Sequence, residues 1–252
     1  MMGLDPRAAA VGVRLVAHEV LDSTNAEALK LAREGERGPL WIVAKRQTAG
    51  RGRRGRPWIS QLGNLFATLL LTAAGSPEHR PQLSLVAALA LHDALAEIAS
   101  NLKPRIAIKW PNDLLLEEAK FAGILVEGEG GEGGAVAVGI GVNCASHPAK
   151  TDYPATDLAT AGFSISSTNL MPPLSLKMVG RLAQWNGGEG FSTVRADWMA
   201  RVAGIGENVG VRLTDRELSG TFEGLDEAGR LMLRLADGRV ETITSADVVT
   251  LR

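Results

Sequence analysis

The sequence contains very little cysteine and histidine, and this scarcity excludes several kinds of site. Cys144 is the single cysteine in 252 residues, so the chain can form no internal disulfide and no thiolate-rich metal centre. The four histidines lie far apart, without the short paired spacings of a zinc site. We therefore expect neither a disulfide framework nor a structural zinc ion.

Long apolar runs and an excess of charge of one sign are also missing. No segment reaches membrane-spanning length and the N-terminus does not resemble a signal peptide, so we expect a cytoplasmic globular protein with no membrane partner. The formal net charge is −1, whereas a dedicated nucleic-acid binder usually carries a basic surplus over its whole domain. Aromatic residues make up only 4% of the chain, but the hydrophobic fraction of 45% is ample for a core.

Strand-like and helical runs are mixed over the first two hundred residues, which indicates an α+β fold. We predict strands over 11–20, 40–44, 64–72, 105–109, 114–116, 121–127 and 135–142, and helices over 23–34, 81–98, 174–185 and 191–202. Residues 1–10 are interpreted as a loose end and 145–172 as irregular. Four short strands at 209–213, 218–225, 230–235 and 240–243 indicate a small appended barrel. The predicted domains are therefore 1–203 and 204–252.

The most unusual stretch is the basic loop, residues 45–58, which concentrates positive charge. It contains six lysines and arginines and three glycines and ends at Trp58, and no acidic residue occurs from Arg37 to Pro77. Like charges repel and glycine raises the entropy cost of ordering, so we expect a mobile loop that closes over an anion. Guanidinium and backbone N–H groups suit a phosphate, and an indole face suits a flat ring. This stretch alone favours a phosphate-bearing small molecule and a nucleic acid about equally.

Three further motifs follow the basic loop in a fixed order. They are 109–113 (KWPND), 120–127 (KFAGILVE) and 139–143 (GIGVN). Together with the loop, these motifs resemble biotin–protein ligase (biotin–[acetyl-CoA-carboxylase] ligase), over roughly residues 13–250. The resemblance implies a class II synthetase-like catalytic domain, whose mixed sheet carries helices mainly on one face, followed by an SH3-like barrel.

The resemblance also implies an activity. Members of that family join biotin to AMP from ATP and then pass the biotinyl group to one lysine of a biotin carboxyl carrier protein, as in acetyl-CoA carboxylase. ATP with Mg²⁺ and biotin are then substrates, and no tightly bound prosthetic group is implied. Some members add an N-terminal DNA-binding domain, but only twenty-two residues precede Ser23. We therefore expect a ligase without that domain and without a nucleic acid partner.

By this resemblance, particular residues are assigned to each part of the site. Those assigned to biotin are Ser23, Thr24, Asn25, Gln47, Gly50, Arg51, Lys120, Gly123 and Ile124. Those assigned to ATP or the adenylate are Arg51, Gly52, Arg53, Trp58, Asn112, Lys120 and Asn143. Lys120, Arg53 and Lys109 are expected to carry the catalysis, because cations lower the repulsion between biotin's carboxylate and the α-phosphate. Asp113 is expected to help hold Mg²⁺ and is a candidate for deprotonating the acceptor lysine.

Several of these residues also have ordinary structural interpretations. Ser23 or Thr24 can simply cap a helix, Trp58 can be a core residue, and Asn112 can form a turn. Two other functions stay open: a lipoate–protein ligase or octanoyltransferase relative with the same fold, and a nucleic-acid-binding protein that uses the basic loop. Exposed sheet edges also leave a homodimer open. The sequence identifies neither the carrier proteins nor the role of the C-terminal barrel.

Overall fold

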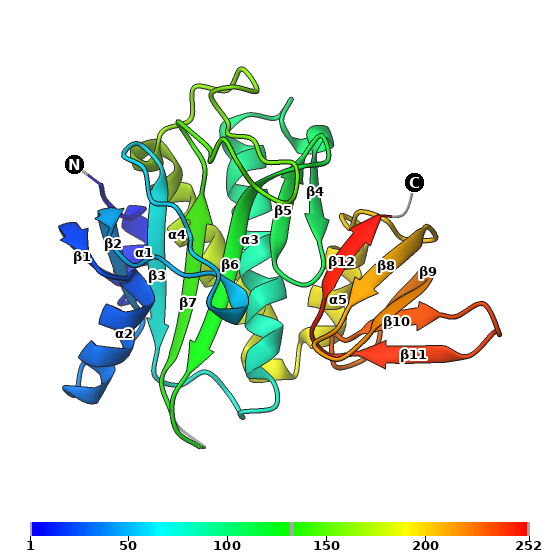
Figure 1. Ribbon diagram of the computed structural model, residues 1–252. Coiled ribbons are helices and arrows are strands. Elements are labelled where there is room, and N and C mark those ends of the chain that lie inside the picture. The colour runs from blue at the N-terminus through cyan, green and yellow to red at the C-terminus, as the bar shows by residue number, and fades with distance from the viewer. Residues whose placement is uncertain (1, 132–133, 251–252) are drawn as a thin grey trace.

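The computed structural model describes residues 2–131 and 134–250, which form a larger and a smaller sheet (Figure 1). The larger sheet has the strand order β1-β2-β3-β7-β6-β5-β4, and the smaller has the order β11-β10-β9-β8-β12. The strands of the larger sheet are β1 (Arg14–Leu21), β2 (Leu40–Gln47), β3 (Leu65–Leu71), β4 (Ile106–Lys109), β5 (Asp113–Leu116), β6 (Ala119–Gly128) and β7 (Val136–Val142). Each lies within about three residues of a predicted strand.

Pairing in the larger sheet is antiparallel except between β1 and β2, so the sheet is mixed, as predicted. Its central strands β3 and β7 are buried along nearly their whole length, because both of their faces are covered. This explains why they read as continuous apolar runs in the sequence rather than as alternating ones.

Helices cover the two faces of this sheet unequally (Figure 1). On one face, α3 (Leu83–Ile98) and α4 (Ser167–Trp185) pack over the main core, with α5 (Phe191–Met199) against both helices. On the opposite face, α2 (Thr24–Arg33) covers a small apolar cluster. The prediction of helices mainly on one face is confirmed. Over the rest of the α2 face the described residues place no α-helix, and the basic loop with its short 3-10 turn (Arg53–Gly55) crosses there (Figure 1).

The N-terminal ten residues are not the loose end that the sequence suggested. Residues Pro6–Ala10 form the short helix α1, which Asp5 caps by accepting a hydrogen bond from the backbone N–H of Arg7 at 2.8 Å. Ala8 is fully buried, so packing against the core holds this segment in place.

Helix α4 begins at Ser167 rather than at 174, so the prediction of an irregular segment there was wrong at its C-terminal end. The late predicted start reflected Pro172 and Pro173, because proline lacks the N–H donor that a helix interior uses. In the structure, the fully buried Leu170 and Met171 anchor this part of the helix in the core. Apolar burial outweighs the missing backbone hydrogen bonds.

The smaller sheet is antiparallel throughout and is consistent with an SH3-like domain. Its strands are β8 (Asn208–Arg212), β9 (Glu217–Leu225), β10 (Leu231–Arg234), β11 (Val240–Ile243) and β12 (Asp247–Thr250). The sequence predicted the first four strands but missed β12, which is too short to show a pattern by itself. Its pairing with β8 places Asp247 beside Arg212.

The segment that joins the two sheets lies along the edge strand β4. Helix α5 ends at Met199, three residues before its predicted end, because Val202 forms a parallel bridge with Ile108. A second contact comes from Trp110, whose indole N–H donates to the carbonyl of Gly229 at 3.1 Å. None of the helices in the described part of the chain combines the length and apolar content needed to span a membrane.

Candidate functional site

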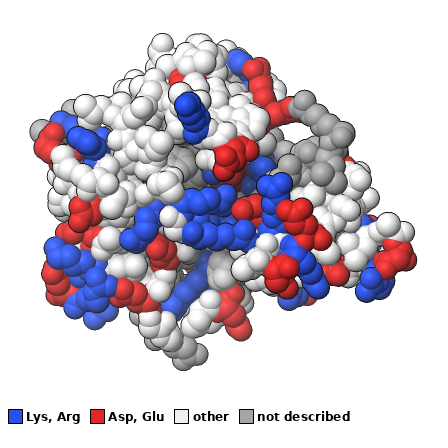
Figure 2. Space-filling model, in the orientation of Figure 1, with Lys and Arg blue, Asp and Glu red and all other residues white. Residues whose placement is uncertain are grey.

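A cleft of about 250 Å³ opens on the α2 face of the larger sheet, between the sheet, the basic loop and the smaller sheet. Figure 2 shows basic side chains gathered across the middle of the face on which, in Figure 1, the basic loop crosses in front of the sheet. Most residues predicted for the site line this cleft: Ser23, Thr24, Asn25, Gln47, Arg51, Gly52, Arg53, Trp58, Lys109, Asn112, Asp113, Lys120, Gly123 and Ile124. The structure therefore brings together residues that lie as much as a hundred positions apart.

One end of the cleft is polar and neutral, and it is built where α2 starts and β2 ends. Ser23 caps α2, because its hydroxyl accepts a hydrogen bond from Ala26 N–H at 3.4 Å. Gln47 Oε1 accepts hydrogen bonds from the backbone N–H of Thr24 at 2.8 Å and from its hydroxyl at 3.1 Å. Ser23 and Thr24 are nearly buried, at 5% and 4% exposure, yet both line the cleft. The same residues therefore cap helix α2 and line the polar end of the cleft.

Asn25 and Thr68 extend this polar cluster beneath the cleft. The Thr68 hydroxyl, fully buried on β3, donates to Asn25 Oδ1 at 2.6 Å and also lies 2.8 Å from the Thr24 hydroxyl. The Asn25 amide donates to the carbonyl of Leu125 at 3.1 Å and to Glu127 Oε2 at 2.8 Å. These bonds fix the amide orientation, so the cluster presents fixed donors and acceptors to a neutral polar ring.

Glycines of β6 and β7 form the floor of the cleft. A Cβ atom at Gly139 would lie 2.3 Å from Asn25 Oδ1, and one at Gly141 would lie 2.7 Å from the Trp58 ring. A Cβ atom at Gly123 would lie 3.1 Å from the same ring. The Trp58 indole therefore rests directly on this glycine floor, as only glycine permits. Its ring N–H is buried and has no acceptor in the described part of the chain.

Lys120 lies at the centre of the cationic part of the cleft. Its ammonium lies 2.7 Å from Asp113 Oδ1, and it faces the rings of Trp58 at 5.6 Å and Tyr153 at 5.2 Å. Lys109 lines the same region; burial lowers the pKa of its ammonium, and the nearby charges of Asp113 and Lys120 act in opposite directions on it. These two lysines place positive charge where the protein partly buries it, and electrostatic interactions are stronger there than in open water.

The basic loop, which we expect to be mobile without a ligand, has partners for several of its arginines in the structure. Asp247 of β12 accepts hydrogen bonds from Arg56 at 2.8 Å and from Arg54 at 3.1 Å. Arg53 donates to Asn112 Oδ1 at 3.0 Å and to the Ser245 hydroxyl at 2.8 Å. The expectation of mobility depended on the lack of a local carboxylate, and a distant one supplies the missing charge.

Burial would raise the pKa of Asp247, but the hydrogen bond from Arg56 and the charges of Arg56, Arg54 and Arg53 outweigh it and lower that pKa below its usual value. Asp247 is therefore ionised at neutral pH. Ser245 and Ala246 hold Arg53 through the serine hydroxyl and the alanine carbonyl, at 2.8 and 3.1 Å. The C-terminal sheet thus contributes directly to the cleft.

Two of the predicted residues do not line the cleft. Gly50 is not part of the cleft lining. Its carbonyl accepts a hydrogen bond from Trp58 N–H at 2.9 Å, and this bond closes the part of the basic loop between the two residues. Asn143 is nearly buried, and its amide donates to the carbonyl of Thr156 at 3.1 Å. That bond holds the 145–156 segment, which carries Tyr153 to the cleft.

The side chains around the cleft do not form a metal centre by themselves. No group of three or more His, Cys, Asp or Glu side chains suited to a metal ion occurs among residues 2–131 and 134–250. Mg²⁺ is commonly held by one or two carboxylates together with substrate phosphates. Asp113 fits that pattern, because its carboxylate lines the cleft beside the cationic side chains of Lys109 and Lys120.

The prediction from sequence missed several residues of the cleft. Asp247 and Arg212 line it from the smaller sheet, and Tyr153 lines it from the 145–156 segment. Glu127 was part of a recognised motif but received no role; it accepts a hydrogen bond from Asn25 and pairs with Arg51 at 3.4 Å. The position of Glu127 in the 120–127 motif was a usable signal, whereas nothing local marks Asp247 or Arg212.

Comparison with known proteins gives consistent matches over both parts of the chain. Residues 17–143 match the Biotin/lipoate A/B protein ligase family, and residues 204–250 match the Biotin protein ligase C terminal domain. A biotin–[acetyl-CoA-carboxylase] ligase of Paracoccus denitrificans is 44% identical over 238 residues, covering 90% of this chain and 96% of that protein. The bifunctional ligase/repressor of Bacillus subtilis is 34% identical, covering 94% of this chain and 74% of that protein.

Solved structures agree with these matches. Biotin protein ligase from Aquifex aeolicus in complex with biotin and ATP superposes with a TM-score of 0.78 at 27% identity, covering 95% of this chain and 99% of that chain. Biotin protein ligase from Leishmania major in complex with biotinyl-5-AMP superposes with a TM-score of 0.65 at 26% identity, covering 92% and 98%.

Proposed function

Because this chain belongs to the biotin/lipoate A/B protein ligase family, we propose that it is an ATP-dependent biotin–protein ligase. It activates biotin with ATP to biotinyl-5′-AMP and transfers the biotinyl group to a lysine of a biotin carboxyl carrier protein, such as that of acetyl-CoA carboxylase. The match to a biotin protein ligase C-terminal domain and the names of the similar proteins favour this over a lipoate–protein ligase or octanoyltransferase.

The observation that carries the proposal is the composition of the cleft from one end to the other. A neutral polar cluster at Ser23, Thr24 and Gln47 is followed by a glycine floor and then by the ammonium of Lys120. Biotin has the matching order: a neutral ureido ring, an apolar chain and a carboxylate. We place the ring at the polar cluster, the chain along Gly123 and Ile124, and the carboxylate at Lys120.

In the first step, an oxygen of biotin's carboxylate attacks the α-phosphorus of ATP. A new carboxyl–phosphate bond forms, the bond between the α-phosphorus and the bridging oxygen breaks, and pyrophosphate leaves with both electrons of that bond. Two anions must meet, so the barrier is largely electrostatic. Lys120, Arg53 and Lys109 lower it by placing positive charge where negative charge develops. ATP enters as its Mg²⁺ complex, and Asp113 would hold that ion together with the phosphates.

The adenosine part of the intermediate is assigned to the basic loop and its neighbours. Trp58 offers an indole face and a ring N–H that no acceptor among residues 2–131 and 134–250 satisfies. Asn112 lines the cleft and is already oriented, because its amide donates to the carbonyl of Ile124 at 2.6 Å. Arg51 and Gly52 are assigned to the phosphate, whereas Asn143 acts through the segment that it holds.

In the second step, the neutral amine of the acceptor lysine attacks the carbonyl carbon of the mixed anhydride. An amide bond forms, the carbonyl–phosphate bond breaks, and AMP leaves. A free lysine has a pKa near ~10.4, so its ammonium must lose a proton before it reacts. Asp113 is our candidate for accepting that proton, because its carboxylate lines the cleft.

We assign catalysis to residues 1–203, with residues 204–252 as a C-terminal domain that completes the cleft through Asp247. The proposal includes no nucleic acid partner, because the net charge is −1 and Arg54 and Arg56 of the basic loop already pair with Asp247. It places the enzyme in the cytoplasm, where ATP and carrier proteins are found. A homodimer would use an unpaired edge such as β1, where Val16 and Val20 are 38% and 54% exposed, and light scattering of the purified protein would test it.

The decisive experiment mixes the protein with biotin, Mg-ATP and a biotin carboxyl carrier domain and measures the mass of the carrier. We expect the mass increment of one biotinyl group, no increment with lipoate, and none after the carrier lysine is replaced. Lys120→Ala should abolish the increment, while the matched control Lys103→Ala, an exposed lysine outside the cleft, should retain it. A carrier that stays unmodified with wild-type protein would refute the proposed function.

A further inference from the structure

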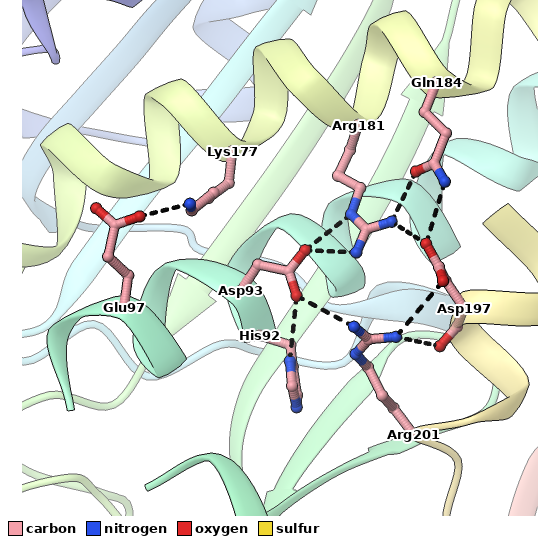
Figure 3. Close-up of polar contacts among 8 residues, drawn as sticks. All are labelled: His92, Asp93, Glu97, Lys177, Arg181, Gln184, Asp197 and Arg201. Atoms are coloured by element: carbon pink, nitrogen blue, oxygen red, sulfur yellow. Dashed lines mark hydrogen bonds and ion pairs between the residues drawn. The ribbon is translucent and has the colours of Figure 1, made fainter. Parts of the chain in front are cut away.

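A cluster of charged side chains joins the three helices α3, α4 and α5, which lie on the face of the larger sheet opposite α2 (Figure 3). Arg181 of α4 lies between Asp93 of α3 and Asp197 of α5, and its side chain is only 13% exposed. It donates to Asp93 Oδ2 from Nε at 2.8 Å and from Nη2 at 2.5 Å, and from Nη1 to the Asp197 carboxylate. Gln184 Nε2 donates to Asp197 Oδ2 at 3.1 Å. The cluster is far more fully bonded than a typical surface ion pair.

A second guanidinium, that of Arg201, joins the cluster from outside the helices. Its Nη2 lies 3.6 Å from Asp93 Oδ1, and its Nη1 donates to the backbone carbonyl of Asp197 at 2.5 Å. Burial would raise the pKa of Asp93, but hydrogen bonds from His92 and Arg181 and the charges of Arg181 and Arg201 lower it overall. The carboxylate that holds Arg201 is therefore ionised at neutral pH.

Arg201 lies beyond the end of α5, in the segment that leads to the smaller sheet. Its carbonyl accepts a hydrogen bond from Ile108 N–H at 2.8 Å, and Ala203 N–H donates to the Ile108 carbonyl at 2.9 Å. Residues 201–203 therefore act as an extra strand beside β4. Lys109, the next residue of β4, lines the cleft. The cluster is thus connected through one backbone segment both to the site and to the C-terminal domain.

The C-terminal domain, in turn, contacts the arginine-rich part of the cleft and, through the Gly229 carbonyl, the indole N–H of Trp110. Ser245, Ala246 and Asp247 contact Arg53, Arg54 and Arg56. The polar cluster at Thr24 and Gln47 is hydrogen-bonded within α2, β2 and β3, and it forms no hydrogen bond with residues 204–250. A change in the position of the smaller sheet should therefore affect the phosphate end of the cleft and spare the biotin end.

We propose that Arg201 is a positioning residue for adenylation: by fixing segment 201–203 against β4, it sets where the C-terminal domain presents Ser245–Asp247 to the basic loop. The expected change in the KM for ATP rests on the proposed function, whereas the expected change in the position of the C-terminal domain does not. The α3–α4 interface does not depend on Arg201, since it has its own apolar core and a separate ion pair between Glu97 and Lys177 (Figure 3).

The test compares Arg201→Met with the matched control Lys177→Met. Both variants remove one cation from the α3–α4–α5 region, but Lys177 contacts Glu97 and not segment 201–203. For Arg201→Met we expect a KM for ATP raised about tenfold and a KM for biotin changed less than about twofold in biotin-dependent pyrophosphate exchange. Lys177→Met should leave both constants unchanged, and Arg201→Lys should recover part of the loss because it keeps the charge.

A second readout needs no substrate. Trypsin cleavage within residues 45–56 of the ligand-free protein, followed by fragment mass, should be several times faster in Arg201→Met than in Lys177→Met or wild type. If Arg201→Met only lowers the Tm, with wild-type loop cleavage and an unchanged KM for ATP, Arg201 merely joins helices and the inference is refuted. If wild-type protein shows no biotin-dependent exchange, the proposed function fails, and the cleavage comparison still decides the role of Arg201.

Discussion

Replacing Gly141 by alanine tests the glycine floor of the cleft with the smallest possible change. The new Cβ atom would lie 2.7 Å from Cε2 and Cζ2 of Trp58, whereas non-bonded carbon atoms pack at about 3.5–4.0 Å. The indole must therefore move by roughly 1 Å, or the strand must shift, and overpacking of this kind typically costs about 1–3 kcal/mol. If the whole of this free energy is needed to hold Trp58 in the position that binds the ligand, kcat/KM for adenylation should fall by roughly 5- to 150-fold.

The assay is biotin-dependent exchange of pyrophosphate into ATP, with the Tm of each variant measured to separate misfolding from a local effect. Gly128→Ala is the matched control, because it lies on the same strand ladder and its Cβ atom would meet no atom closer than 3.6 Å. Trp58→Phe should relieve the clash, so the double variant should lose less activity than the two single losses combined. Wild-type kinetics for Gly141→Ala, or strictly additive losses in the double variant, would refute the account of the floor.

Three other changes follow from the same geometry. Lys120→Ala should abolish pyrophosphate exchange without lowering the Tm greatly, and Lys120→Arg should restore little because a planar fork replaces a compact ammonium; exchange near the wild-type rate would contradict the assignment. Because the pKa of Asp247 is lowered in the folded protein, its contribution to stability is complete above the unfolded pKa of about 3.9 and is lost as pH falls through the folded value. Asp247→Asn should therefore lower the free energy of unfolding at about pH 6, and the loss should shrink steadily as the pH is lowered below about 3.9, as measured by urea denaturation. Trypsin should cut the basic loop more slowly with biotin and slowest with biotin and ATP, and equal rates in all conditions would show that the loop does not close over the adenylate.

Local patterns were enough to predict most of the fold. The apolar runs of β3 and β7 and the long apolar helix α3 are marked by composition alone, since burial on both sides requires it. The failures occurred where tertiary contacts outweigh local preference. Pro172 and Pro173 gave a late start for α4, and β12 has too few residues to show a period.

For the cleft, the sequence motifs identified the residues of the larger sheet and of the basic loop. They could not identify Asp247 or Arg212, because a carboxylate nearly two hundred residues away leaves no trace near the arginines that it pairs with. For the same reason, no sequence pattern indicated that Asp247 pairs with the loop arginines. Asn143 was recognised as part of a motif, but only the structure shows that its amide is used to hold the 145–156 segment.

The pairing of Arg56 with Asp247, 191 positions apart, has a consequence during synthesis of the chain. At about 5–20 residues per second, a ribosome needs roughly 10–40 seconds to make the residues that separate them. Throughout that interval, the nascent loop carries its arginines without the carboxylate that later neutralises them. Ribosomal RNA is the nearest polyanion, so we expect the emerging loop to interact with the ribosome surface in a salt-dependent way until β12 has been made and pairs with β8.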